Sequence, residues 1–178
     1  MPAGATVREA HHPNLMKQYL LPVFLSCSFF AAAQQIDVPE VEYRSEADYA
    51  AQHEKVIEVI NHLENFPADV YTEQRKQAAA YLMTWLQGSP DVTVTVQSYA
   101  APLLGYGESL VIFMGEYAKH VIRNPEGDEL TYNVAAMESV INYYRDNVDV
   151  FGRNKDFDKL VKLQEKGKLE KYIDKQIS

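Results

Sequence analysis

The sequence predicts an all-α fold, a single-domain bundle of five to six helices with at most a short two-stranded β patch. Three observations support this prediction. Apolar residues recur at intervals of three and four along most of residues 45–173. Glycine and proline divide this pattern into blocks of helical length. The alternation that is typical of a strand is confined to one run, residues 92–96.

Residues 16–33 have the features of a secretory signal peptide. Lys17 supplies a positive start, residues 19–30 form an apolar stretch, and residues 31–33 are the small alanines that a signal peptidase requires. The apolar stretch is shorter than the about 20 residues that cross a membrane. We therefore expect residues 1–33, an upstream extension plus the signal peptide, to be removed. The exported protein is residues 34–178, with no transmembrane segment, in the periplasm or outside the cell.

A lipid anchor is the alternative to a soluble exported protein. Residues 24–27, with the sequence FLSC, loosely resemble the motif in which a bacterial cysteine is lipidated. Lipidation at Cys27 would produce an anchored envelope protein. Because Cys27 is the only cysteine, the soluble form would contain neither a disulfide nor a reactive thiol.

Two helices are expected in the first half of the exported chain. The first begins with a capping-box sequence at Ser45, whose side chain is expected to accept from an amide near Asp48, and runs to Phe66-Pro67. The second runs from near Asp69 to Gly88, and a proline follows two residues later.

The run of alternating valine and threonine at residues 92–96 predicts a strand. A lone strand leaves its backbone groups unpaired, so it needs a partner or water. The internal candidate for a partner is residues 41–43.

The second half of the exported chain predicts a central helix over residues 108–123, because its apolar stripe is wide. Gly115 is expected to allow close contact with another helix. The stripe is expected to be the centre of the core, and it contains Leu110, Met114, Tyr117 and Val121. The next helix has apolar residues at a strict 4-3-4-3-4 spacing, namely Leu130, Val134, Met137, Ile141, Tyr144 and Val148.

The charge of the chain is unevenly distributed. The whole sequence has 17 basic and 25 acidic residues, a net charge of −8, which argues against a nucleic acid partner. Residues 153–178 are the exception and form a basic segment with two short helices on either side of Gly167. We expect this segment to dock on the acidic body through its apolar residues, which are Phe157, Leu160, Leu169, Tyr172 and Ile173.

No motif in the sequence predicts a catalytic, cofactor or metal site. His53-Glu54 begins a zinc-protease pattern, but Ile57 stands at the second ligand position, and His62 falls on the opposite helix face. These histidines are expected at the surface. Glu58 with His62, and Glu116 with His120, are expected to form solvated pairs. Residues 105–107 lack the third glycine of a dinucleotide fingerprint and predict a turn, and residues 126–129 lack the ligands of a calcium loop.

Three stretches cover much of the exported chain: residues 85–96 (WLQGSPDVTVTV), 111–125 (VIFMGEYAKHVIRNP) and 159–173 (KLVKLQEKGKLEKYI). Together they resemble a group of small, uncharacterised secreted all-helical proteins of gram-negative bacteria, which has no assigned activity. The resemblance implies an exported helical domain and carries over no catalytic residue.

Three classes of function stay open. The favoured one is an exported, non-catalytic protein that acts in the cell envelope by binding a protein, either another one or a second copy of itself. The alternatives are a small-ligand carrier with an apolar cavity under Trp85, and a secreted hydrolase whose acidic pair comes from different helices. Two facing carboxylates in a deep pocket would favour the hydrolase, a dry cavity the carrier, and a flat exposed patch the binding protein.

Overall fold

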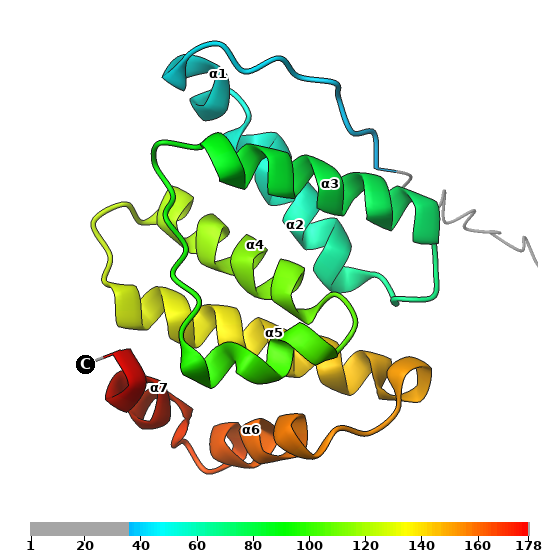
Figure 1. Cartoon of the computed structure of the whole chain (residues 1–178), viewed down its shortest axis with the longest axis vertical. Helices are drawn as coiled ribbons and strands as arrows, with labels where there is room; N and C mark the ends of the chain where they lie inside the picture. The colour runs from blue at the N-terminus through cyan, green and yellow to red at the C-terminus, as the bar shows by residue number, and fades with distance from the viewer. Residues whose placement is uncertain (1–35, 178) are drawn as a thin grey trace, which may run out of the picture. The chain divides into compact units, whose positions relative to one another are not determined.

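The computed structural model of the chain describes residues 36–177, so the expected signal peptide and Cys27 lie outside the described part. Within it the chain forms seven α-helices and one 3-10 helix, and no strand (Figure 1). The all-α prediction is confirmed, whereas the predicted helix number is too low and the β patch is wrong. The elements are α1 (Glu46–Ala50), α2 (His53–Asn65), α3 (Thr72–Gly88), η1 (Ser98–Gly105), α4 (Ser109–Arg123), α5 (Glu129–Phe151), α6 (Lys155–Glu165) and α7 (Leu169–Ile177).

The helix count differs because a turn divides the first predicted helix into α1 and α2. Just before this turn, at the end of α1, the carbonyl of Tyr49 accepts a hydrogen bond from the indole nitrogen of Trp85, 3.1 Å away. The capping box expected at Ser45 is present at the start of α1, where the carboxylate of Asp48 accepts from the backbone N–H of Ser45 at 2.8 Å. The eighth helix is η1, which no apolar period predicted.

The start of α3 lies at Thr72, three residues after Asp69, where the second helix was expected to begin. Tyr71 adopts a left-handed conformation with φ +55°, which the regular helix cannot include. The expected end at Gly88 is confirmed, because the next residue is extended.

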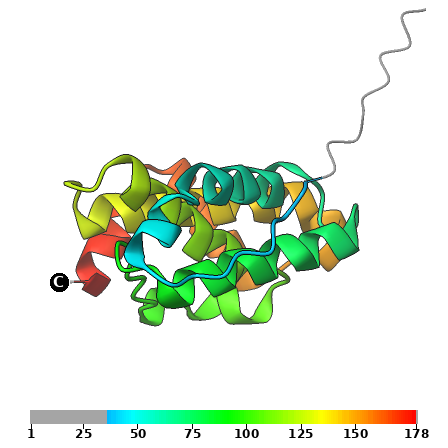
Figure 2. The ribbon, with the colours of Figure 1, turned by 90° about the horizontal axis from the view of Figure 1, so that it is seen from above.

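Residues 92–96 do not pair with residues 41–43. No backbone hydrogen bond involves Val92 to Val96 within the described part of the chain. Residues 36–44 instead run alongside α3 (Figure 2) and line a groove with Tyr81 and Thr84. Both extended segments therefore pack most of their apolar side chains on helices, and within residues 36–177 neither joins a sheet.

The helices α4 and α5 lie between the pair α2 and α3 and the pair α6 and α7 (Figure 1). The close approach expected at Gly115 is confirmed. A Cβ atom added there would lie 3.0 Å from a methyl carbon of Leu82 and 3.1 Å from Ile60, so α3 and α2 both press on this point of α4.

The buried face of α4 is shifted from the predicted stripe. Of the four predicted residues only Tyr117 is buried, whereas Leu110, Met114 and Val121 are half-buried. The most deeply buried side chains of α4 are instead Ile112, Phe113 and Ala118. The shift arises because α4 also buries polar residues, Glu116 and Lys119, where it faces α2 and α5.

The C-terminal segment packs on α5 through apolar side chains. The Phe157 ring stacks on Tyr144 with 5.0 Å between centroids, and the other buried residues are Leu160, Leu169 and Ile173. Gly167 separates α6 from α7 with φ +61°. An ion pair at 3.4 Å also joins Arg145 of α5 to Glu165 of α6, so here the acidic body provides the basic partner and the basic segment the acidic one.

Arg75 on α3 is fully buried and connects four elements. Its guanidinium donates to the carbonyls of Leu63 at 2.9 Å and Phe66 at 2.8 Å, at the end of α2. It also pairs with Glu108, which precedes α4, at 2.5 Å, and it lies 6.0 Å from the ring centre of Tyr143 on α5. Arg75 therefore fixes the corner where these helices meet.

Candidate functional site

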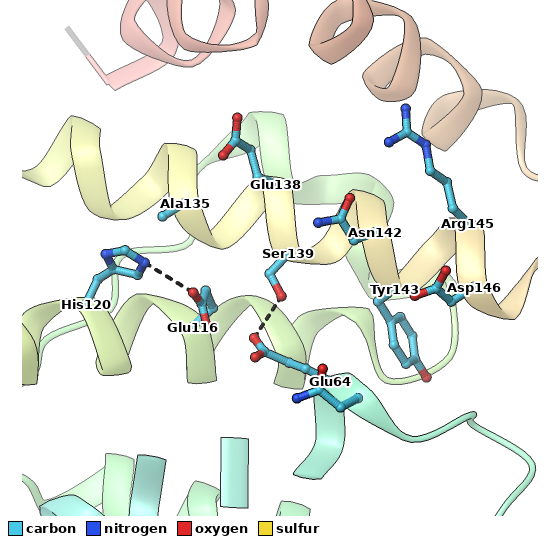
Figure 3. A pocket seen from close by; sticks show the side chains of 11 residues that line it. Glu64, Glu116, His120, Ala135, Glu138, Ser139, Asn142, Tyr143, Arg145 and Asp146 are labelled. Carbon is cyan, nitrogen blue, oxygen red and sulfur yellow. Dashed lines mark hydrogen bonds and ion pairs between the residues drawn. The ribbon is translucent and has the colours of Figure 1, made fainter. Parts of the chain in front are cut away.

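An acidic groove of about 610 Å³ opens between the end of α2, α4 and α5 (Figure 3). We call it the acidic groove because carboxylates predominate among its ionisable side chains. Arg145 and His120 are the basic groups that line it. The carboxylates come from three helices and are Glu64, Glu116, Glu138 and Asp146.

The floor of the acidic groove contains two carboxylates joined by a buried lysine. The Lys119 side chain is 8% exposed, and its ammonium lies 2.8 Å from a carboxylate oxygen of Glu64. The same ammonium forms an ion pair with Glu116 one turn earlier on α4, although without hydrogen-bond geometry at that oxygen. Asn61 accepts a third contact at 3.2 Å, so α2 and α4 are joined through this one ammonium.

The other oxygen of Glu64 accepts a hydrogen bond from the Ser139 hydroxyl of α5 at 2.7 Å (Figure 3). Burial raises the pKa of the Glu64 carboxyl to about 7, and the adjacent Glu116 carboxylate adds to the rise. The positive charge of Lys119 partly opposes it. Glu64 is therefore a carboxyl that gains and loses its proton near neutral pH.

His120 lies at the edge of the acidic groove, with its Nε2 atom 3.1 Å from Glu116. Burial lowers the pKa of the imidazole, and the charges of Lys119 and Arg123 lower it further. The expected contact between Glu116 and His120 is present, but it is not the solvated pair that we predicted, because the Glu116 side chain is 11% exposed.

The other histidine predictions are corrected in part. His62 is buried against the Phe66 ring, 4.6 Å between centroids, and is not a surface residue. Glu58 pairs with Lys55 at 2.5 Å, so its expected pair with His62 is not formed. His53 is half-buried, and its Nε2 atom lies 3.5 Å from Asp91.

The turn expected at residues 105–107 is present, and Gly107 has φ +50°. Asp128, in the stretch that lacks the ligands of a calcium loop, caps α5 by accepting from the Thr131 amide at 2.9 Å. Among residues 36–177, no group of three or more potential metal ligands is placed to hold an ion.

Trp85, under which an apolar cavity was expected, is fully buried and donates its indole hydrogen to Tyr49. The grooves beside α3 and between α5 and α6, of about 480 and 550 Å³, are both lined by polar as well as apolar side chains.

No sequence pattern indicates that Glu64 and Lys119 belong to one site. The spacing of Glu116, Lys119 and His120 predicts neighbours on one helix face, but this pattern is common on solvated helices. The contribution of α2 depends on how α2 packs against α4, which no local pattern encodes.

No helix in residues 36–177 is both long enough and apolar enough to span a membrane. No protein-family model, no curated protein and no solved structure matches the chain.

Proposed function

We propose that the chain is an exported, non-catalytic binding protein that receives a basic side chain of a partner protein in the acidic groove. The observation that carries the proposal is the composition of this groove, in which four carboxylates face one arginine and one histidine. A hollow whose lining has an excess of one sign of charge attracts the opposite charge and accelerates encounter. Export is supported by Lys17, the apolar residues 19–30 and the alanines that follow.

The position of Lys119 favours binding over catalysis. In a glycosidase the bond to be cleaved lies between two carboxyl groups, so the space between them must be free for substrate. Here the Lys119 ammonium contacts both Glu64 and Glu116. A buried ion network of this kind is costly to separate, so it supports a fixed floor for the groove.

The rim of the groove provides the charge that a partner meets first. Glu138 and Asp146 are exposed on α5, two turns apart on the face that lines the groove. Exposed charges at a rim mainly affect the association rate and its dependence on salt. We therefore expect binding that weakens as ionic strength rises.

The test is affinity capture from a cell-envelope extract with three baits, followed by mass spectrometry. The first is the unmodified protein, and the second carries Glu138→Lys with Asp146→Lys. The matched control carries Glu54→Lys with Glu126→Lys, two exposed acids outside the groove, so both variants change the net charge equally. A specific partner should bind the unmodified protein and the control but not the groove variant. Equal capture by all three baits would refute binding in the groove.

Export has its own test, which is N-terminal sequencing of the protein recovered from the producing cells. We expect the mature chain to begin at Gln34, after loss of residues 1–33. A membrane-bound product that begins at a lipidated Cys27 would instead support the anchored form.

A hydrolase is the second candidate, because a carboxyl whose pKa is raised to about 7 is suited to donate a proton near neutral pH. Glu64 would be the general acid and Glu116 the second carboxylate, after displacement of Lys119. Release of reducing ends from envelope polysaccharide, abolished by Glu116→Gln, would support it. Equal rates for the variant and the unmodified protein would exclude this pair as the catalytic one.

A further inference from the structure

Residues 92–96 form an extended segment whose side chains alternate between buried and exposed positions but whose backbone groups are not paired. The segment links α3 to η1 across one face of the helices (Figure 1). Its side chains alternate as in a strand, because Val92 is buried and Val94 half-buried while Thr93 and Thr95 are exposed. Within residues 36–177, none of its backbone N–H or C=O groups forms a hydrogen bond.

Unpaired strand groups of this kind are a template for pairing with another chain. Buried backbone groups are almost always hydrogen-bonded in proteins, and an extended segment satisfies them by pairing or through water. Valine and threonine are residues that favour strands. The segment thus has the conformation and composition of an edge strand, although the described part of the chain provides no second strand.

We propose that residues 91–97 pair antiparallel with the same residues of a second copy of this chain, about a two-fold axis through Val94. The sequence of residues 92–96, VTVTV, is the same in both directions. This pairing therefore places threonine opposite threonine and valine opposite valine, which are favourable cross-strand pairs. An interface related by a two-fold axis needs such self-complementarity.

The charges and the ends of the segment agree with this register. Residues 92–96 carry no charge in a chain whose net charge is −8. At the ends, Asp91 falls opposite Gln97 of the second copy, so like charges do not meet. Pro90 cannot donate to a ladder, and the helix η1 begins at Ser98, so both ends of the pairing are defined.

The exposed side chain of Val96 supports the same occupant. It is one of the large apolar side chains of the described region that remain exposed, at 41%. In the proposed pairing Val96 lies opposite Val92 of the second copy, at the point where that residue enters its own core. Each copy would thus cover the valine that the other leaves in water.

Two paired strands bury less than the roughly 1,200 Å² typical of a stable interface. We therefore expect a weak, concentration-dependent dimer. This dimer does not use the acidic groove, so the proposed function and the pairing can fail separately.

Sedimentation equilibrium of the purified chain, at concentrations up to about 1 mM, tests the pairing with two matched variants. The first carries Thr93→Lys with Thr95→Lys, which places like charges opposite each other in the proposed register. The second carries Thr93→Lys with Thr95→Glu, which places opposite charges there. Both positions are exposed, so both variants should retain the helical circular dichroism spectrum.

We expect the unmodified chain and the Lys/Glu variant to dimerise and the Lys/Lys variant to bind at least tenfold more weakly. The Lys/Lys change reduces the negative net charge, so general repulsion between copies would predict the reverse order. In the dimer, alternate amides of residues 91–97 should exchange more slowly than in the monomer.

Three results would overturn the proposal. A chain that stays monomeric at all concentrations would exclude pairing between copies and would indicate that the segment pairs with a strand of another protein. Equal dimerisation of all three proteins would place the interface elsewhere. Equal loss in both variants would exclude the register about Val94.

Discussion

Replacing Glu64 with glutamine should remove a pH dependence from the stability of the protein. In the folded state the pKa of this carboxyl is raised from 4.5 to about 7 by burial and by Glu116. The folded state therefore binds the proton more tightly than the unfolded state does. The resulting stabilisation is fully present below pH 4.5 and is lost as the pH rises through 7.

The magnitude follows from the two pKa values. Their difference corresponds to about 3 kcal/mol of unfolding free energy that the unmodified protein loses between pH 4 and pH 8. Glutamine has no proton to lose, and its amide can replace the contacts to Ser139 and Lys119. The stability of Glu64→Gln relative to the unmodified protein should therefore rise by about 3 kcal/mol over this range.

Urea unfolding followed by circular dichroism, repeated at intervals from pH 4 to pH 8, measures this difference. Comparing variants at each pH is necessary because His62 and His120 have lowered pKa values. Their contribution has the opposite slope, since it is present above the ordinary histidine pKa and lost as the pH falls.

Glu138→Gln is the matched control, because Glu138 lines the same groove but is exposed. It removes one carboxylate from the same groove without touching the contacts of Glu64, so it measures the effect of losing a groove charge alone. If the difference for Glu64→Gln changes by less than about 0.5 kcal/mol, the scale of a surface change, the assignment of the raised pKa to Glu64 is wrong.

Three further predictions concern stability and can be checked by the same unfolding assay. Arg75→Met should lower the free energy of unfolding by about 3–5 kcal/mol, because it leaves two carbonyls and a carboxylate without their donor. Arg145 is partly exposed, so Arg145→Met should lower it by less than about 1 kcal/mol. Equal losses in the two variants would contradict the role of the buried guanidinium. Phe113→Ala should lower the free energy of unfolding by about 3–5 kcal/mol, and by more than Met114→Ala, since Phe113 is fully buried and Met114 is not. The reverse order would support the buried stripe that was predicted from the sequence. Deletion of residues 153–178 should lower the melting temperature clearly, because it uncovers the side of α5 on which α6 and α7 pack; an unchanged melting temperature would show that this segment adds no stability.

Local patterns were sufficient to predict the helical class of the fold. The strict spacing of apolar residues from Leu130 to Val148 and the glycine at position 167 correspond to α5 and to the break between α6 and α7. These features are determined by residues close together in the sequence, since helix periodicity and left-handed glycines are local properties.

The failures come from tertiary contacts that override local preference. Residues 92–96 have a strand sequence, but Val92 and Val94 are covered by helices, and no strand lies beside them within residues 36–177. The buried face of α4 was predicted from hydrophobicity alone, whereas Lys119 is buried because carboxylates from α2 and α4 compensate its charge. Such compensation depends on a residue 55 positions away in the chain.

The groove was not predicted for the same reason. Each of its three helices has an ordinary distribution of acidic residues, and only their packing brings Glu64 next to Glu116. The pKa of the Glu64 carboxyl is raised to about 7 by burial in the folded state. No local sequence pattern can therefore predict it.

Trp85 gives the protein a built-in optical reporter. It is the only tryptophan of the chain, it is fully buried, and its indole N–H donates to the carbonyl of Tyr49 at the end of α1. Its fluorescence will therefore report the opening of the α2 and α3 side of the molecule. The helices α6 and α7 contain no tryptophan, so their melting leaves this fluorescence unchanged and is followed instead in the far-ultraviolet circular dichroism signal. Whether the two signals change at the same temperature will show if the molecule melts as one cooperative unit or in two stages.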